Sequence, residues 1–127
     1  MLKEFINVRQ IEGESKKRWF EDDFFDLIVW LTKNEKIIGF QLCYDKNINE
    51  KTLTWKINSG FTHRRIDTGE YGGLRYKETP VLVKDRFFNK RKIADIFLKE
   101  STEIDQKIAK FVYQKIKEYK SIGILNH

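Results

Sequence analysis

The 127-residue sequence contains one cysteine, one proline and two histidines. A single cysteine excludes an internal disulfide, and one cysteine with two histidines cannot supply the four ligands of a usual structural zinc site. The longest apolar run, Leu27 to Leu31, has five residues, whereas a membrane-spanning helix needs about 20. The first residues show neither the apolar stretch nor the cleavage site of a secretory signal. We therefore expect a cytoplasmic protein that does not span a membrane and holds no metal and no cofactor.

The charge of the chain is unevenly distributed. There are 25 Lys or Arg residues against 19 Asp or Glu residues, a formal net charge of +6. Residues 1–60 hold ten of each sign, and residues 61–127 hold 15 basic against nine acidic residues. Such an excess favours phosphates or acidic partners. It is equally typical of drift toward A/T-rich codons, which inflates lysine without selection for binding, and the sequence leaves both interpretations open.

The apolar content indicates a folded protein with strands in its first half. Hydrophobic residues make up 40% and aromatic residues 14% of the chain, which excludes intrinsic disorder, and the length fits a single domain over residues 1–127. Aromatic and β-branched residues gather in short segments, and residues 51–58 alternate with a period of two. We expect strands over residues 5–11, 17–20, 24–32, 37–44, 51–58 and 61–66, with a further short strand considered for 81–83.

The last third of the chain predicts two helices, over about residues 89–120. Asn89 is a candidate N-cap for a helix of about ten residues, and Thr102 with Asp105 resembles a capping box before the second helix. Apolar residues recur every three to five positions from Ile104 to Tyr119. Strands followed by helices predict an α+β fold: a curved antiparallel meander of about five or six strands, with two C-terminal helices packed on one face. Between them, the glycine-containing segment 67–79 is expected to form a long loop able to close over a ligand.

Several motifs resemble a family of short, uncharacterised bacterial proteins. They are Arg18-Trp19-Phe20, Phe25 to Trp30 (FDLIVW), Gly39 to Asp45 (GFQLCYD), Leu53-Thr54-Trp55, Gly60-Phe61-x-His63 and Thr79-Pro80-x-Leu82-Val83. The resemblance covers roughly residues 17 to 85. It implies a small bacterial protein, and it implies no activity and no site residue.

Turn positions predict the register of the central strands. A turn centred on Asn34-Glu35 places Asp26 opposite Cys43, Ile28 opposite Gln41 and Trp30 opposite Gly39. A turn centred on Ile48 places Cys43 opposite Leu53, Gln41 opposite Trp55 and Gly39 opposite Ile57. A turn at Ser59 places Trp55 opposite His63, Leu53 opposite Arg65 and Ile57 opposite Phe61. In this register one face of the sheet carries an acid, an amide, an imidazole and a guanidinium among aromatic rings, the composition of a ligand pocket.

Our leading hypothesis is that this face binds a small anionic molecule. Its expected ligand-binding residues are Asp26, Trp30, Gln41, Trp55, His63 and Arg65. The tryptophans offer rigid apolar area, Arg65 offers a forked partner for a carboxylate or phosphate, and Asp26 would orient Arg65 or His63. His63 is the only group of the set expected to exchange protons near neutral pH, so the sequence leaves open whether the protein is an enzyme. The competing interpretation is that the aromatic residues are ordinary core and that the polar groups satisfy one another.

The alternative function is non-specific nucleic-acid binding through the basic segment 64–92. The cationic side chains of this segment would bind the phosphates of the backbone, and Tyr71 or Tyr76 would stack on exposed bases. The cationic residues are Arg64, Arg65, Arg75, Lys77, Lys84, Arg86, Lys90, Arg91 and Lys92. No helix-turn-helix, zinc-finger or aromatic RNP motif supports specific recognition. Neither the ligand nor the oligomeric state follows from the sequence.

Overall fold

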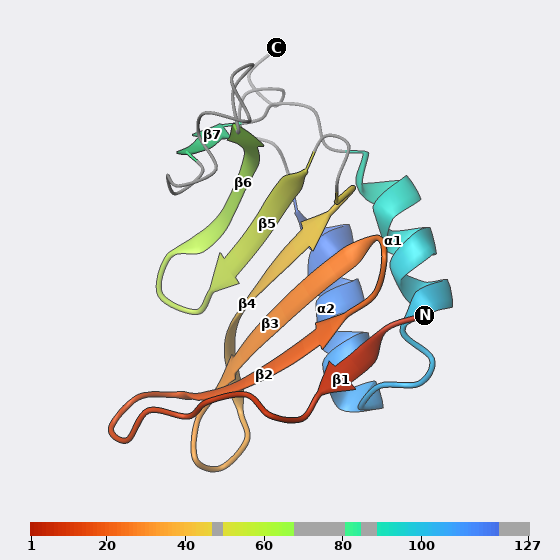
Figure 1. The fold of residues 1–127 in the computed structure, drawn as a ribbon. Coiled ribbons are helices and arrows are strands. Elements are labelled where there is room, and N and C mark those ends of the chain that lie inside the picture. The colour runs from red at the N-terminus through yellow and green to blue at the C-terminus, as the bar shows by residue number, and fades with distance from the viewer. Residues whose placement is uncertain (47–49, 68–80, 85–88, 120–127) are drawn as a thin grey trace, which may run out of the picture.

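The computed structural model of the chain describes residues 1–46, 50–67, 81–84 and 89–119, with the backbone alone for 66–67 and 81–84 (Figure 1). Apart from Asp67, the loop expected over residues 67–79 lies outside the described residues, as do Arg75, Lys77 and Arg86. The strands are β1 (Lys3–Phe5), β2 (Lys16–Glu21), β3 (Phe25–Leu31), β4 (Ile37–Tyr44), β5 (Lys51–Lys56), β6 (Gly60–Asp67) and β7 (Val81–Lys84). The helices are α1 (Lys90–Glu100) and α2 (Gln106–Glu118).

The strands form one antiparallel sheet in the order of the chain. Each of β1 to β7 pairs only with its sequence neighbours, and every pairing is antiparallel. Figure 1 shows α2 behind the central strands and α1 beside it at the right of the view. Phe97 of α1 meets Phe25 of β3, so both helices cover the same face of the sheet. The expected α+β meander with two C-terminal helices on one face is therefore confirmed. The sheet has seven strands where we expected five or six, because the short segment β7 pairs with β6.

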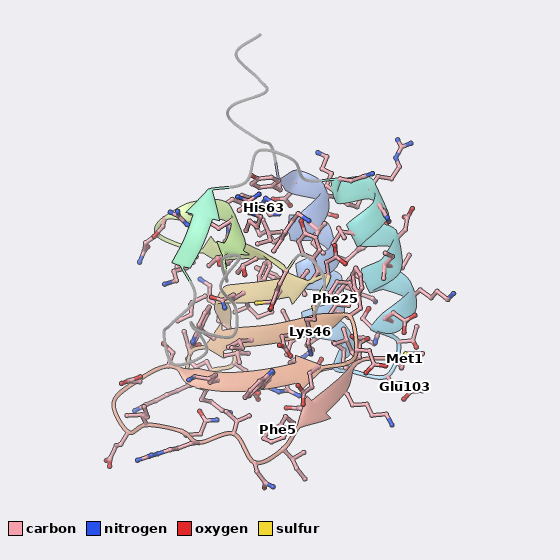
Figure 2. The ribbon with its side chains drawn as sticks, turned by 45° about the horizontal axis from the view of Figure 1, so that its top comes forward. Met1, Phe5, Phe25, Lys46, His63 and Glu103 are labelled. Atoms are coloured by element: carbon pink, nitrogen blue, oxygen red, sulfur yellow. The ribbon has the colours of Figure 1, made fainter. Side chains whose placement is uncertain are left out.

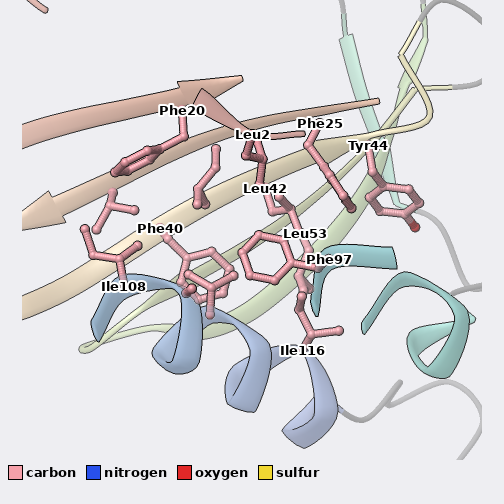
Figure 3. Packing of buried hydrophobic residues seen from close by; sticks show 14 of the residues in the cluster. Leu2, Phe20, Phe25, Phe40, Leu42, Tyr44, Leu53, Phe97, Ile108 and Ile116 are labelled. Carbon is pink, nitrogen blue, oxygen red and sulfur yellow. The ribbon is translucent and has the colours of Figure 1, made fainter. Parts of the chain in front are cut away.

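Side-chain alternation directs one face of each central strand into the core. Along β3, every second residue from Phe25 to Leu31 is buried. Figure 3 shows Phe25 between the sheet and the helices, in one hydrophobic cluster with Phe40 and Leu42 of β4 and Ile108 and Ile116 of α2. We call this the helix face, and the opposite side of the sheet the outer face.

Polar side chains begin both helices. Asn89 Oδ1 accepts a hydrogen bond from Lys92 N at 3.1 Å, which confirms the predicted N-cap of α1. For α2 the N-cap is Asp105, whose Oδ1 accepts a hydrogen bond from Lys107 N at 2.9 Å.

Among the described residues no helix is long and apolar enough to cross a membrane.

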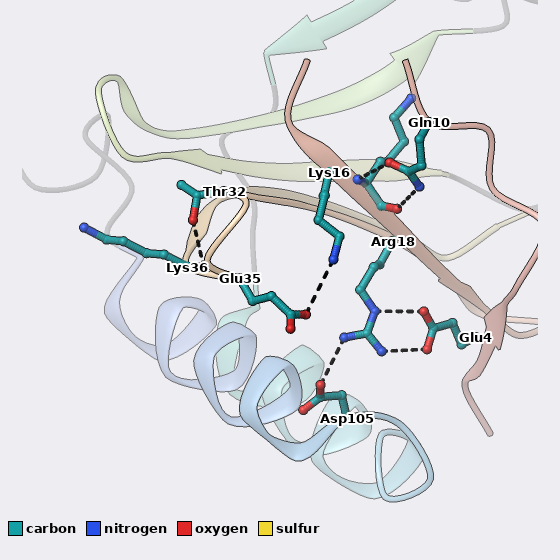
Figure 4. Close-up of polar contacts among 9 residues, drawn as sticks. Glu4, Gln10, Lys16, Arg18, Thr32, Glu35, Lys36 and Asp105 are labelled. Carbon is teal, nitrogen blue, oxygen red and sulfur yellow. Dashed lines mark hydrogen bonds and ion pairs between the residues drawn. The ribbon is translucent and has the colours of Figure 1, made fainter. Parts of the chain in front are cut away.

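Arg18 joins three elements on the helix face (Figure 4). Its guanidinium donates to both carboxylate oxygens of Glu4, at 2.7 and 2.8 Å, and to Asp105 Oδ2 at 3.0 Å.

The strand expected over residues 5–11 is wrong, because β1 ends at Phe5. Beyond it, the side-chain amide of Gln10 replaces a backbone partner: it donates to Lys17 O at 2.7 Å and accepts from Lys17 N at 2.9 Å.

The predicted register is correct for the first hairpin and wrong for the next two. β3 and β4 pair as expected, with Asp26 opposite Cys43 and Trp30 opposite Gly39. Between β4 and β5 the pairing is shifted by one residue, so Leu42 rather than Cys43 lies opposite Leu53. This shift turns Leu53 and Trp55 to the helix face, where burial of their apolar surface stabilises the register.

The pairing of β5 with β6 is shifted by two residues from the prediction. Trp55 lies opposite Phe61, and Leu53 lies opposite His63. The turn is centred on Asn58, because Lys56 pairs with Gly60 and three residues lie between them. Gly60 has a φ of +77°, the left-handed conformation that closes a three-residue hairpin turn and that glycine adopts without strain.

Candidate functional site

The structure divides the ligand-binding residues predicted from the sequence between the two faces of the sheet. Asp26, Trp30 and Gln41 lie on the outer face. The one-residue shift between β4 and β5 places the other three, Trp55, His63 and Arg65, on the helix side. The predicted register had brought all six to one face, and that arrangement is wrong.

Trp55 and His63 are part of the packing beneath α2. The Trp55 ring meets Phe111 edge-on at 5.3 Å between centroids. His63, labelled in Figure 2, is 3% exposed. Its Nε2 lies 2.6 Å from the hydroxyl oxygen of Tyr44, which is itself buried. The interpretation of these residues as core therefore holds for Trp55 and His63, whereas Arg65 is exposed.

Asp26 and Gln41 belong to a polar cluster at one end of the outer face. Asp26 Oδ1 accepts a hydrogen bond from Lys46 Nζ at 3.2 Å, so its partner is a lysine rather than the expected Arg65. Gln41 Nε2 lies 3.8 Å from Cys43 Sγ, and that sulfur lies 3.4 Å from Thr52 Oγ1.

The electrostatics of this cluster disfavour an anionic ligand. Burial raises the pKa of the Cys43 thiol, which keeps it protonated rather than a nucleophilic thiolate. Burial and the nearby negative charge of Asp26 raise the pKa of the Glu50 carboxyl. An added anion would meet the same repulsion from the carboxylates.

Trp30 lies at the other end of the outer face, in a groove. The groove has a volume of about 510 Å³ and is formed by the connection between β1 and β2, the ends of the central strands and the turn between β5 and β6. In Figure 1 these two connections lie at the lower left, at the same end of the sheet. The lining residues are Gly13, Glu14, Ser15, Lys17, Trp30, Ile38, Gly39, Lys56, Ile57, Asn58 and Ser59.

Four residues in register across four strands form the floor of the groove. Lys17 on β2 lies opposite Trp30 on β3, Trp30 lies opposite Gly39 on β4, and Gly39 lies opposite Lys56 on β5. Neighbouring strands are about 4.8 Å apart, so the two lysine backbones are roughly 14 Å apart with the indole between them. Lys56 Nζ lies 5.6 Å from the centroid of the Trp30 ring. We call these four residues the Trp30 row.

The charges of the groove favour an anion. Lys17 and Lys56 face one carboxylate, Glu14, and neither lysine forms an ion pair within the described part of the chain. Ser15, Asn58 and Ser59 add exposed hydrogen-bonding groups from the two connections. The lining includes neither histidine nor cysteine, so it offers binding groups rather than a group that exchanges protons near neutral pH.

Sequence reasoning missed Lys17 and Lys56. The correct β3–β4 register had already placed Trp30 opposite Gly39, and the alternation along residues 51–58 gave Lys56 the face opposite to Trp55. The missing information was the β4–β5 register, because a one-residue change exchanges Ile57 for Lys56 beside Gly39.

The described residues of the basic segment lie on separate elements. Arg64 and Arg65 are adjacent on β6, so their side chains leave the strand on opposite faces. Lys90, Arg91 and Lys92 open α1, and Lys90 Nζ donates to the backbone oxygens of Lys117 and Tyr119 at 3.0 and 3.1 Å. Lys84, on β7, is described by its backbone alone.

No metal site is found among the residues that the structure describes: no three His, Cys, Asp or Glu side chains lie close enough together to hold an ion.

The chain matches no family model, no curated protein and no solved structure. Its function is therefore inferred from its own residues.

Proposed function

We propose that the groove over the Trp30 row binds a small anionic ligand that contains a planar, apolar group. The observation that carries this proposal is the register Lys17–Trp30–Gly39–Lys56, which places one half-buried indole between two lysines on a concave surface. The hypothesis of a small anionic ligand is thus retained, at one end of the outer face and with a different set of residues.

The indole of Trp30 supplies the apolar part of the binding energy. A planar group stacked on an aromatic side chain gains roughly 1–3 kcal/mol. The volume of about 510 Å³ lies in the usual range for pockets that take small molecules.

The two lysines supply charge, and the connections supply directional hydrogen bonds. Lys17 is half-buried and Lys56 is exposed, so solvent screens Lys56 more strongly. An exposed lysine contributes less than about 1 kcal/mol, so Trp30 should determine affinity and the lysines should select for a negative charge.

Calorimetric titration with three related probes separates these two contributions. AMP joins a planar base to a phosphate, adenosine keeps the base without the charge, and ribose 5-phosphate keeps the charge without the base. We expect AMP to bind more tightly than either of the other two. Flavin mononucleotide and indole-3-acetate extend the set of planar anions.

Variants assign the binding to the groove. Trp30→Leu should weaken both AMP and adenosine by roughly tenfold, because both lose the stacking surface. Lys56→Gln should weaken AMP by up to about fivefold and leave adenosine unchanged. Lys99→Gln on α1, an exposed lysine outside the groove, is the matched control and should bind as the wild type does. Absence of saturable binding by every planar anion, or equal AMP affinity in the three variants, would overturn the proposal.

A further inference from the structure

A second concave surface lies between the two helices, away from the Trp30 row. This cleft has a volume of about 500 Å³. Its lining residues are Lys90, Arg91, Ala94 and Asp95 of α1 and Tyr113 and Lys117 of α2. We call it the helix cleft. Three of its six side chains are cationic and one is anionic, so its charge is clearly positive.

Lys90 forms a fixed part of the wall of this cleft. Its ammonium donates two hydrogen bonds, to Lys117 O and Tyr119 O, at the C-terminal end of α2. An ammonium has three N–H donors, and backbone carbonyls carry no formal charge. The positive charge of Lys90 therefore remains, and one donor remains for a ligand.

Arg91 and Lys117 bring further donors that the described part of the protein does not use. Neither side chain forms a hydrogen bond or an ion pair with a described residue, although Lys117 Nζ lies 5.1 Å from the centroid of the Tyr113 ring. A guanidinium presents a fixed fork of N–H groups that fits two oxygens of a phosphate at once. Ala94, which is buried, leaves space between these longer side chains.

From this arrangement we propose that the helix cleft binds a phosphate group, held by Arg91, Lys117 and the remaining donor of Lys90. Three donors that approach from two helices fit a tetrahedral phosphate, whose oxygens point in several directions, better than a planar carboxylate. Asp95 is the single opposing charge among three cations, so the net charge of the lining stays positive. The phosphate belongs either to a small molecule or to a nucleic-acid backbone.

The test is an NMR titration of the ¹⁵N-labelled protein with inorganic phosphate, against sodium chloride of equal ionic strength. Phosphate should shift the backbone signals at the start of α1 and the end of α2 in a saturable way. The double variant Arg91→Gln/Lys117→Gln should weaken this binding by roughly tenfold or more. Both side chains are exposed, so the spectrum of the variant should retain the dispersion of the folded protein.

Lys92→Gln is the matched control, because Lys92 belongs to the same turn of α1 but does not line the helix cleft. It should change the phosphate affinity by less than about twofold. Lys56→Gln, which removes a cation of the Trp30 row, should also leave the phosphate-induced shifts of α1 and α2 unchanged, and this separates the two sites.

A second arm distinguishes the two sources of the phosphate. A ten-nucleotide single strand that binds more tightly than inorganic phosphate, and loses this advantage in the double variant, identifies a nucleic-acid backbone. Binding of inorganic phosphate alone identifies a small phosphorylated ligand. Signal shifts that spread over all exposed lysines on phosphate addition, or an equal phosphate affinity of the wild type and the double variant, would overturn the proposal.

Discussion

Trp30 covers Gly39 across the β3–β4 pair. The two residues lie directly opposite each other, and a Cβ at position 39 would be 3.3 Å from Trp30 Cε3. The same Cβ would be 3.0 Å from the backbone oxygen of Trp55 on β5. An aromatic ring over a strand glycine replaces the packing that the missing side chain cannot provide. Because Trp30 also lines the groove, Gly39 allows the indole to lie close to the strand there.

Gly39→Ala should therefore destabilise the protein and weaken ligand binding together. The methyl group would press against the backbone oxygen of Trp55 and against the Trp30 ring, so the indole has to shift. The free energy of unfolding should therefore fall by about 1–3 kcal/mol. Urea unfolding measures the loss, and AMP titration measures the displaced indole. Ser59→Ala, an exposed change in the same groove, should stay within about 0.5 kcal/mol of the wild type. Unchanged stability of Gly39→Ala would contradict this account of the contact.

Arg18 should make the stability of the protein depend on acidic pH through Asp105. The Arg18 guanidinium lowers the pKa of the Asp105 carboxyl below its usual value. A carboxyl with a lowered pKa in the folded state stabilises the protein above its unfolded pKa, about 3.9, and that contribution is lost as the pH falls through the folded pKa. Arg18→Gln should cost about 1 kcal/mol near pH 7 and less near pH 3.

Urea unfolding of the wild type and Arg18→Gln at both pH values checks this sign. Asp105→Asn is the matched control, because asparagine also serves as an N-cap but carries no charge. In the Asp105→Asn background, Arg18→Gln should lower the free energy of unfolding by less than it does in the wild type. The remaining loss comes from the contacts of Arg18 with Glu4. A difference between wild type and Arg18→Gln that grows toward pH 3 would contradict the expected role of Asp105.

The contact between Tyr44 and His63 should contribute to stability because both side chains are buried. Their polar atoms lie 2.6 Å apart, and removing one member of a buried hydrogen bond costs about 1–3 kcal/mol. Tyr44→Phe should lower the free energy of unfolding by that amount while the sheet is retained. Tyr113→Phe on α2, a half-buried tyrosine with no hydrogen bond to another described residue, is the control and should have little effect. Equal losses in the two variants would show that the His63 contact contributes nothing specific.

The sequence by itself determined the central strands, the two helices and those connections that carry a local signal. Asn89 predicted the start of α1 because an asparagine side chain can bond the backbone three residues later. The four polar residues 33–36 fixed the β3–β4 hairpin, and the pair Trp30–Gly39 could be predicted from that turn alone. Half of the candidate site, the indole and its glycine, was therefore accessible without a structure.

Only the tertiary structure decided which residues join Trp30. The sequence of the connection 45–50 did not by itself specify one register. The choice depended on burial of Leu53 and Trp55 on the helix face, where Trp55 meets Phe111 of α2, 56 residues further along the chain. That burial placed Lys56 beside Gly39 and removed His63 and Arg65 from the outer face. Strand side chains alternate with a period of two, so a single residue of shift exchanges the two faces. Its direction is set by packing between segments that are distant in sequence, which local patterns do not encode.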